Sequence, residues 1–290
     1  MPQNPNLPSR AIVLVHQGSA WHLPYVLRQL RAWNPCAEIV LLSDRPQWVC
    51  ARFCKIATIR DYFDEAAKLE GVFVNLSDNP SWYELLCLQR WAIVLEYARR
   101  HGLGEVIHLD TDVMVFADLW ELVELDWAEH DFVITGWQGP QSMFIRNLGV
   151  LEAFWNFIVV SYRENFADVE REFRDWRARG SMGGVSDMHF LHKFIARGGA
   201  RFGDNGVPVR GAVFDSNVHE ADGFAHNGEI KALRLEAEVP WGQRLDGTSV
   251  RFHTLHFQGM SKKFIPQFST LRDGWVRVFG VLNKLRSLRG

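Results

Sequence analysis

The stretch EVIHLDTDVMVF, residues 105–116, contains two mainly apolar runs with a pair of aspartates between them. The runs 105–109 and 113–116 are typical of buried strands. Asp110 and Asp112 therefore stand on a tight turn at the carboxyl end of the first strand, the edge at which open α/β sheets bind ligands. Two carboxylates there can hold Mg²⁺ or Mn²⁺. A solvated turn is the simpler alternative for the bare Asp-x-Asp pattern.

Toward the N-terminus the sequence predicts a strand, a helix and a second strand. The apolar run Ala11–Val15 predicts the first strand, helical spacing covers Leu23–Trp33, and EIVLL at 38–42 predicts the second strand. This is a βαβ unit, which makes a parallel pair of strands. The loop His16-Gln17-Gly18-Ser19 follows the first strand, and a nucleotide site can begin there.

The rest of the chain continues the alternation of strands and helices. A capping box at Ser81–Glu84 predicts the start of a long helix that ends near His101-Gly102. We read one α/β domain over residues 11–265, preceded by a flexible segment 1–10 and followed by a helical extension 266–290. Further strands are predicted at 56–59, 72–74, 132–135, 207–214, 230–235 and 250–255, and further helices at 61–69, 148–162, 168–179 and 186–196.

Composition limits the function classes. The chain is 47% hydrophobic and 23% charged, as folded globular proteins are, and its net charge of -2 argues against a surface that binds nucleic acid. Twelve Trp and twenty Phe can serve sugar stacking or core packing. Four cysteines in the first third, with no secretory signal and no apolar stretch long enough to span a bilayer, predict a cytoplasmic protein with reduced thiols.

A second motif, HFQGMSK at 256–262, follows another predicted strand. The imidazole of His256 can complete a metal shell, Gly259 lets the backbone approach a phosphate, and Lys262 supplies a point charge for a diphosphate. Each residue also has a simpler explanation when taken alone. His256 can be a core histidine bonded to a carbonyl, and Lys262-Lys263 can be a solvated pair.

Together the two motifs resemble one family. Ile107–Val113 is similar to the hydrophobic strand and Asp-x-Asp of GT-A glycosyltransferases. His256–Lys262 resembles the H-[FY]-x-G-x-x-K motif of the retaining family that contains glycogenin and bacterial lipopolysaccharide glucosyl- and galactosyltransferases. The resemblance covers roughly residues 10–265. It implies a Rossmann-like GT-A fold with a mainly parallel central sheet, and an enzyme that uses Mn²⁺ or Mg²⁺ with a nucleotide sugar, expected to be a UDP-hexose.

The resemblance also implies roles for particular residues. The family's metal ligands fall on Asp110, Asp112 and His256, and its diphosphate-binding residues fall on Gly259 and Lys262. Nucleotide contacts fall on Asp110 and Thr111, and the uridine pocket falls on His16, Gln17, Gly18 and Asp44.

Two further segments match the family less well. The Asn-Ser-Gly segment that touches the donor sugar corresponds to Asn147-Leu148-Gly149, and the aspartate that opens a helix near the reacting sugar corresponds to Asp187. Asp187 can equally be a plain helix cap. The Pro-Trp that commonly follows the motif lysine is replaced by Lys263-Phe264, so the chain is a divergent member.

The family mechanism gives this assignment a chemistry. A divalent cation and Lys262 stabilise the leaving diphosphate. The acceptor hydroxyl then attacks from the leaving-group face, with retention at the anomeric carbon. Double displacement through Asp187 is the alternative, and Asn147 is a candidate for contact with the sugar. The loop Gly136–Ser142 and the helix at Asp187 are expected to choose the donor sugar.

The predicted acceptor is a growing glycan or a lipid-linked glycan. Two other classes stay open: a metal-dependent phosphoesterase or nucleotidyltransferase, and a nucleotide- or glycan-binding module without turnover. The segment 272–290 carries five basic residues against one acidic residue, with apolar residues near one helical face. Such a helix can lie on an anionic membrane, here the inner face, or pack on the domain.

Overall fold

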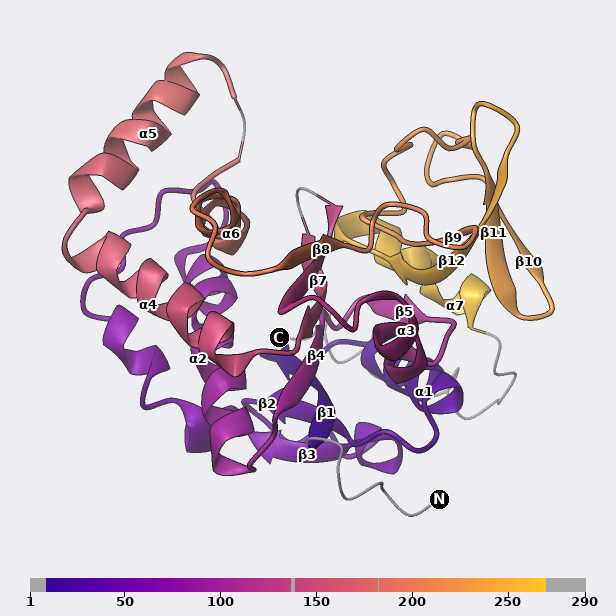
Figure 1. The fold of residues 1–290 in the computed structure, drawn as a ribbon, viewed down its shortest axis with the longest axis horizontal. Coiled ribbons are helices and arrows are strands. Elements are labelled where there is room, and N and C mark those ends of the chain that lie inside the picture. The colour runs from indigo at the N-terminus through magenta and orange to yellow at the C-terminus, as the bar shows by residue number, and fades with distance from the viewer. Residues whose placement is uncertain (1–8, 137–138, 182, 270–290) are drawn as a thin grey trace.

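The computed structural model describes residues 9–136, 139–181 and 183–269. A seven-stranded sheet forms the centre of this part of the chain (Figure 1). Its strand order is β3 (Lys55–Thr58), β2 (Ile39–Ser43), β1 (Arg10–His16), β4 (Glu105–Leu109), β7 (Gly139–Ile145), β6 (Phe132–Thr135) and β8 (Phe202–Asp204).

The direction of the strands places the ligand-binding edge. Strands β3, β2, β1 and β4 are parallel to one another, β7 is antiparallel to both of its neighbours, and β8 is parallel to β6. The sheet is therefore mainly parallel, as predicted. The strand order reverses between β1 and β4, and a crevice opens at the carboxyl ends of strands at such a switch point. His16 is the last residue of β1, and Asp110 comes directly after the end of β4.

Helices cover both faces of the sheet because its central strands are apolar on both sides. On β1, Ala11 and Val13 belong to the core that contains α2 (Ser81–Arg100), α4 (Leu148–Arg163) and α6 (Asp187–Ala196). Ile12 and Leu14 belong to the core on the other face, with α1 (Leu23–Trp33) and α3 (Leu119–Asp126). Side chains that alternate along a strand account for this division. Helix α5 (Phe166–Ala178) packs on α4 away from the sheet (Figure 1).

A second sheet brings the C-terminal motif to this edge. Its order is β10 (Leu233–Glu236), β11 (Val239–Gln243), β12 (Ser249–His256) and β5 (Val113–Val115), and β9 (Ala212–Phe214) pairs with β12. Because β12 runs antiparallel to β5, His256 lies opposite Val113. The turn between β4 and β5 therefore meets the end of β12. The chain continues as a 3-10 helix, η5 (Gly259–Phe264), and α7 (Ile265–Phe268).

Several sequence-based predictions are wrong in detail. Residues 72–74 are not a strand, and residues 59–69 form two short 3-10 turns, Ile59–Tyr62 and Ala66–Leu69, instead of one helix. Glu84 does not close a capping box with Ser81. It is buried, and it accepts hydrogen bonds from the side chains of Ser77 and Asn79. Strands β7, β8 and β11 and helix α3 were not predicted.

Most of the predicted flexible segment 1–10 and of the predicted C-terminal helix 266–290 lies outside the described residues. Of the segment predicted to be flexible, residues 1–8 lie outside the described residues and Arg10 belongs to β1. Of the predicted C-terminal helix, α7 includes the first residues and 270–290 lie outside. Among the helices that the structure describes, none has the length and apolarity needed to cross a membrane.

Candidate functional site

Three predicted metal ligands converge at the switch point. One ligand atom each from Asp110, Asp112 and His256 lies within 4.8 Å of the others. The fold explains this convergence. The Asp110 N–H donates to the carbonyl of Gln141 on β7 at 2.9 Å, and the Phe257 N–H donates to the carbonyl of Asp112 at 3.0 Å. The two carboxylates are thus fixed from both sheets.

The chemistry of these side chains fits a divalent cation. Two carboxylates and an imidazole are donors that Mn²⁺ accepts, and the carboxylates also suit Mg²⁺. The Nδ1–H of His256 donates to the carbonyl of Ser216 at 2.6 Å, so Nε2 is the ring nitrogen that faces Asp112, at 3.4 Å from Oδ1. A carbonyl on the far ring nitrogen is the usual companion of a metal-binding histidine.

Without a metal ion, basic side chains balance the carboxylates. Lys262 Nζ lies 2.7 Å from Asp112 Oδ2, and Arg90 Nη1 lies 2.5 Å from Asp110 Oδ1. Burial raises the pKa of Asp110, but the Arg90 guanidinium and His108 outweigh it and lower that pKa to about 2. Burial likewise opposes ionisation of Asp112, yet His256 and Lys262 hold its pKa below the usual range. Both carboxylates are therefore ionised at neutral pH.

The same contacts set the charge of His256. Burial lowers its pKa, but the charge of Asp112 and the hydrogen bond to it dominate and raise the pKa to about 9. In the metal-free protein the ring is therefore an imidazolium at neutral pH. Ligation of a metal by Nε2 requires that nitrogen to lose its proton.

Arg90 is a site residue that the sequence reasoning missed. It lies on α2 and joins Asp110 to Asp187, contacting Asp187 Oδ2 through Nη2 at 2.5 Å and Nε at 3.1 Å. Trp91 Nε1 donates to the same oxygen at 3.1 Å, and the Met188 N–H donates to Oδ1 at 3.0 Å. The missed signal is an arginine within the apolar stretch of a long helix, because a buried guanidinium needs carboxylate partners.

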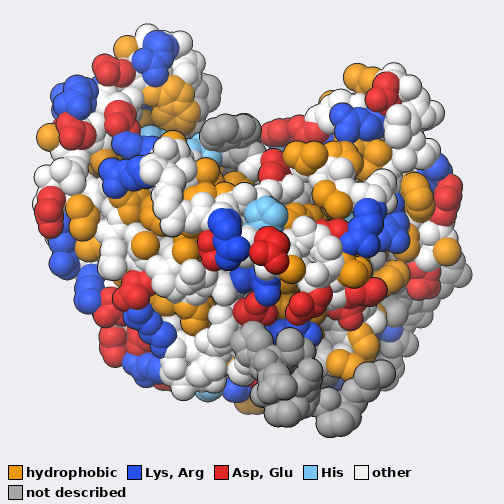
Figure 2. Space-filling model, viewed as in Figure 1, with side chains coloured by type: hydrophobic (Ala, Val, Ile, Leu, Met, Phe, Trp, Pro, Cys, Tyr) orange, Lys and Arg blue, Asp and Glu red, His pale blue; other side chains and the backbone are white. Residues whose placement is uncertain are grey.

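The N-cap of α6 is Ser186, and Asp187 follows it, so the alternative of a plain helix cap does not describe Asp187 fully, and its role near a sugar stays a prediction. Asp187 is the first residue of α6, it bonds the helix N-terminus, and it is buried. It also lines a cavity of about 150 Å³ together with Asp110, Arg90 and His256. Ser186 and Met188 also line this cavity, as do Ser216, Asn217 and Glu220. Figure 2 shows the surface hollowed between the lobe that carries α5 and the lobe that carries β10 and β11.

The predicted nucleotide loop lies beside the carboxylates. His16 Nδ1 is 3.3 Å from Thr111 Oγ1, and the Gly18 N–H donates to Asp44 Oδ1 at 2.8 Å. Gly18 has a φ of 86°, which favours glycine. Asp44 also lines a cavity of about 530 Å³ beyond the ends of β2 and β3. Gln17 is an exposed residue of the loop.

The motif predicted to bind a diphosphate leads into a 3-10 helix. Gly259 is the first residue of η5 and has a φ of 58°, a backbone conformation that glycine adopts without strain. This turn carries Lys262 back toward Asp112, 2.7 Å from Oδ2. The spacing of the motif therefore has a local structural reason.

The structure does not bring Asn147 to the other predicted site residues. Strand β7 runs antiparallel to β4 and pairs Ile145 with Val106, so Asn147 lies at the amino end of β4, the edge opposite Asp110. There its side chain accepts from the Gly149 N–H at 3.0 Å and caps α4. The segment of β7 that reaches the cavity is its beginning, Gly139 to Gln141. Residues 139–142 are therefore strand, although we predicted a loop over 136–142.

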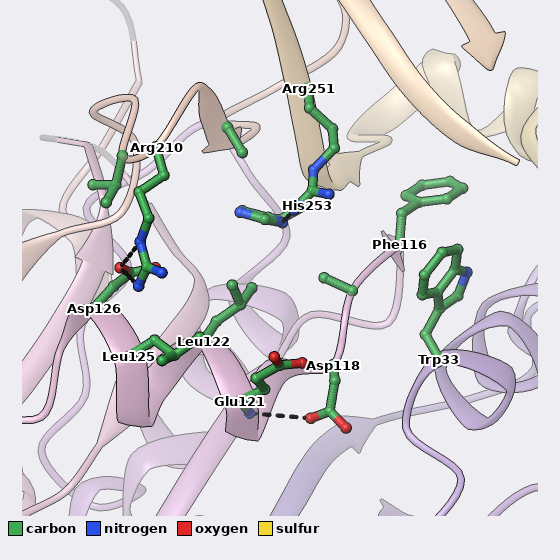
Figure 3. A pocket seen from close by; sticks show the side chains of 13 residues that line it. Trp33, Phe116, Asp118, Glu121, Leu122, Leu125, Asp126, Arg210, Arg251 and His253 are labelled. Atoms are coloured by element: carbon green, nitrogen blue, oxygen red, sulfur yellow. Dashed lines mark hydrogen bonds and ion pairs between the residues drawn. The ribbon is translucent and has the colours of Figure 1, made fainter. Parts of the chain in front are cut away.

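A further cavity of about 300 Å³ lies at the other end of β5 (Figure 3). Trp33 and Phe116 lie on one side of it, Arg251 and His253 above, and Arg210 opposite the rings, paired with Asp126. It shares no lining residue with the cavity at the metal cluster.

The predicted site residues gather at one edge of the sheet, with Asn147 as the exception.

Comparison with known proteins supports the fold. No family model matches the chain, and no curated sequence does. Among solved structures, the bifunctional glycosyltransferase WbbM superimposes with a TM-score of 0.54 and 12% identity over 95% of this chain and 52% of WbbM. The galactosyltransferase LgtC, solved with donor and acceptor sugar analogues, superimposes with a TM-score of 0.44 and 10% identity over 93% of this chain and 99% of LgtC. A glycosyltransferase involved in glycosylation of the major capsid of PBCV-1 superimposes with a TM-score of 0.46 and 9% identity over 90% of this chain and 99% of that protein.

The described residues therefore have the GT-A fold of glycosyltransferases. The chain spans about half the length of WbbM, the first of these proteins. Within that fold, the cluster of two aspartates and a histidine is a candidate metal centre.

Proposed function

We propose that this protein is a metal-dependent glycosyltransferase that moves a hexose from a nucleotide diphosphate sugar, a UDP-sugar, to a glycan or glycolipid. The observation that carries the proposal is the convergence of Asp110, Asp112 and His256 within 4.8 Å, at the switch point of a GT-A sheet. Fold alone does not define function, so the argument rests on this site.

The next part of the proposal concerns the nucleotide half of the substrate. We propose that the loop at His16–Gly18, Thr111 and Asp44 binds the nucleoside, with the base toward the 530 Å³ cavity that Asp44 lines. Gly259 lets the backbone approach the diphosphate, and Lys262, on a flexible stem, can exchange Asp112 for a phosphate oxygen. A bound Mn²⁺ or Mg²⁺ would neutralise charge on the leaving diphosphate.

Asp187 and Arg90 are suited to hold the donor sugar in place. Asp187 Oδ2 accepts three hydrogen bonds, two of them from Arg90, so the carboxylate is fixed and its charge is shared. This arrangement favours orientation of a sugar hydroxyl over nucleophilic attack. It therefore supports retention by attack from the leaving-group face, with the proton of the acceptor hydroxyl passing to the departing diphosphate.

The acceptor is expected on the open side of the same cavity. A larger cavity of about 580 Å³ adjoins it, since Ser216 and Glu220 line both. We propose that part of a glycan acceptor lies there. The contact of the basic segment 272–290 with a membrane stays a prediction, because 270–290 lie outside the described residues. The cytoplasmic location also stays a prediction.

The test is release of free nucleotide from a panel of UDP- and GDP-sugars, with Mn²⁺ and with chelator. Slow Mn²⁺-dependent hydrolysis of one donor is expected in the wild type and lost in Asp112→Ala. Asp168→Ala, which removes an exposed aspartate of α5 that does not line the cavity at the metal cluster, is the matched control and should keep the rate.

The other outcomes separate the alternatives. Mn²⁺-dependent nucleotide binding without turnover, with or without candidate glycans, would favour a binding module. Release of the nucleoside monophosphate instead of the diphosphate would favour a phosphoesterase or nucleotidyltransferase. Absence of any nucleotide binding would contradict the assignment of the site.

A further inference from the structure

Lys231 is a buried cation that the proposed chemistry does not use. Its side chain is 1% exposed, and Nζ donates to Asp215 Oδ1 at 2.8 Å, to the Asn217 carbonyl at 2.6 Å and to Asp222 Oδ2 at 2.9 Å. An ammonium group has three donors, and all three are engaged here. A lysine is rarely buried unless such partners compensate it.

The partners of Lys231 surround the residue that holds the metal-binding histidine. Asp215 and Asn217 flank Ser216, whose carbonyl accepts from His256 Nδ1 at 2.6 Å and from Gln141 Nε2 at 3.2 Å. Asp215 Oδ2 accepts from the His256 N–H at 3.1 Å. Lys231 thus reaches the backbone of His256 through one intermediate residue, Asp215, and its ring through two, Asp215 or Asn217 and then Ser216.

Asp222 closes this arrangement on the other side. Its Oδ2 accepts from Lys231 and also from Ser216 Oγ at 2.5 Å. Residues of the segment 215–222 line both the cavity at the metal cluster and the adjoining 580 Å³ cavity, and Ser216 is common to the two, so we treat this segment as the wall between them. The wall between the two cavities is therefore tied at three points to one ammonium group.

We propose that Lys231 is a positioning residue for the metal centre. By fixing residues 215–217, it keeps the Ser216 carbonyl on Nδ1 of His256, so that Nε2 points to Asp112. Lys231 touches neither His256 nor the two aspartates. The inference rests on the proposed metal-dependent function, since it assigns a purpose to the orientation of His256.

The first experiment compares Lys231→Met with Arg146→Met in the full chain. Arg146 is a matched control, because it pairs with buried Glu105 at the opposite edge of the sheet. Mn²⁺ affinity is measured by electron paramagnetic resonance without donor, at a temperature where both variants are folded. Loss of a partner of this kind weakens metal affinity about 10–100-fold. We expect that loss in Lys231→Met and no change in Arg146→Met.

Equal loss of stability in the two variants with unchanged Mn²⁺ affinity in Lys231→Met would overturn the proposal, because Lys231 would then be merely structural. If Lys231→Met does not fold, Asp222→Asn removes the charge of one contact and keeps the buried pair with Asp215. Asn tolerates the positive φ of 47° at this position. A several-fold loss of Mn²⁺ affinity is expected, and an unchanged affinity would contradict the proposal.

A readout without metal keeps the inference separate from the proposed function. The Nδ1–H proton of His256, sheltered by Ser216, should give a slowly exchanging resonance in ¹⁵N-edited spectra of the metal-free protein. The resonance should be lost in Lys231→Met and kept in Arg146→Met. If the wild type binds no Mn²⁺, the proposed function fails. Loss of the resonance would still support the positioning role, and its persistence would refute it.

Discussion

Replacement of Arg90 by methionine should destabilise the protein strongly, because it leaves two carboxylates without their cation. The side chain of Arg90 is 11% exposed and that of Asp187 is 4% exposed, so solvent can do little to compensate. Breaking a buried ion pair by removing one partner costs about 3–5 kcal/mol. Asp187 keeps the bonds from Trp91 and Met188, and Asp110 is 26% exposed, so we expect the lower end, about 3 kcal/mol.

Urea denaturation of the metal-free protein measures this loss, and Arg174→Met provides the control. Arg174 pairs with Glu170 on the exposed face of α5, where removal should cost less than about 0.5 kcal/mol. The double variant Arg90→Met, Asp187→Asn also removes one of the two uncompensated charges, the more deeply buried one. It should recover about 1–2 kcal/mol relative to Arg90→Met. The reasoning fails if Arg90→Met costs no more than the control, or if Asp187→Asn adds a further loss.

Three other predictions follow from the same structure. Asn147→Ala should cost about 1 kcal/mol in urea denaturation through loss of the α4 cap and leave donor hydrolysis unchanged, whereas slower hydrolysis would restore the catalytic role predicted from sequence. Gly18→Ala should cost about 1 kcal/mol because of its φ of 86° and weaken UDP binding in calorimetry; equal binding would place the nucleoside elsewhere. The metal-free protein should be most stable near pH 6.5, as chemical denaturation across pH can show. Burial opposes the positive charge of His256, but Asp112 raises its pKa to about 9, so its stabilisation is lost as the pH rises toward 9. Burial lowers the pKa of His22 and of His253 to about 4, so the unfolded chain takes up their protons first and stability falls below pH 6.5, by about 1.4 kcal/mol per pH unit for each. A flat profile between pH 4 and 9 would contradict these assignments.

The metal cluster could be predicted from sequence because its residues lie at ends of apolar strands. Asp110 follows a continuous buried run at the carboxyl edge of the mainly parallel sheet. His256 closes a buried run of the second sheet, whose antiparallel pairing with β5 brings it to the same edge. The left-handed turn at Gly259 likewise lies within a local motif. In these cases the chemistry depends on a short stretch of chain, which a sequence displays directly.

Strand direction and helix rotation could not be predicted in the same way. The segment Gly139–Ile145 begins with Gly-Pro and buries Gln141 and Ser142, so neither its composition nor its pattern favours a strand, and nothing local shows that it runs antiparallel. The position of Asn147 depends on that direction. Arg90 depends on the rotation of α2 against the sheet, and Lys231 on partners 9 to 16 residues away that form no regular element.

The charges at the site bear on how its substrates bind. Asp110, Asp112 and Asp187 are matched by Arg90, Lys262 and the imidazolium of His256, so the metal-free cluster is close to neutral. A divalent cation added alone would meet three positive groups and would have to displace Lys262 and a proton. An anionic diphosphate offers Lys262 a new partner and offsets the added charge. Metal and nucleotide sugar should therefore strengthen each other's binding, and by linkage the factor must be the same in both directions.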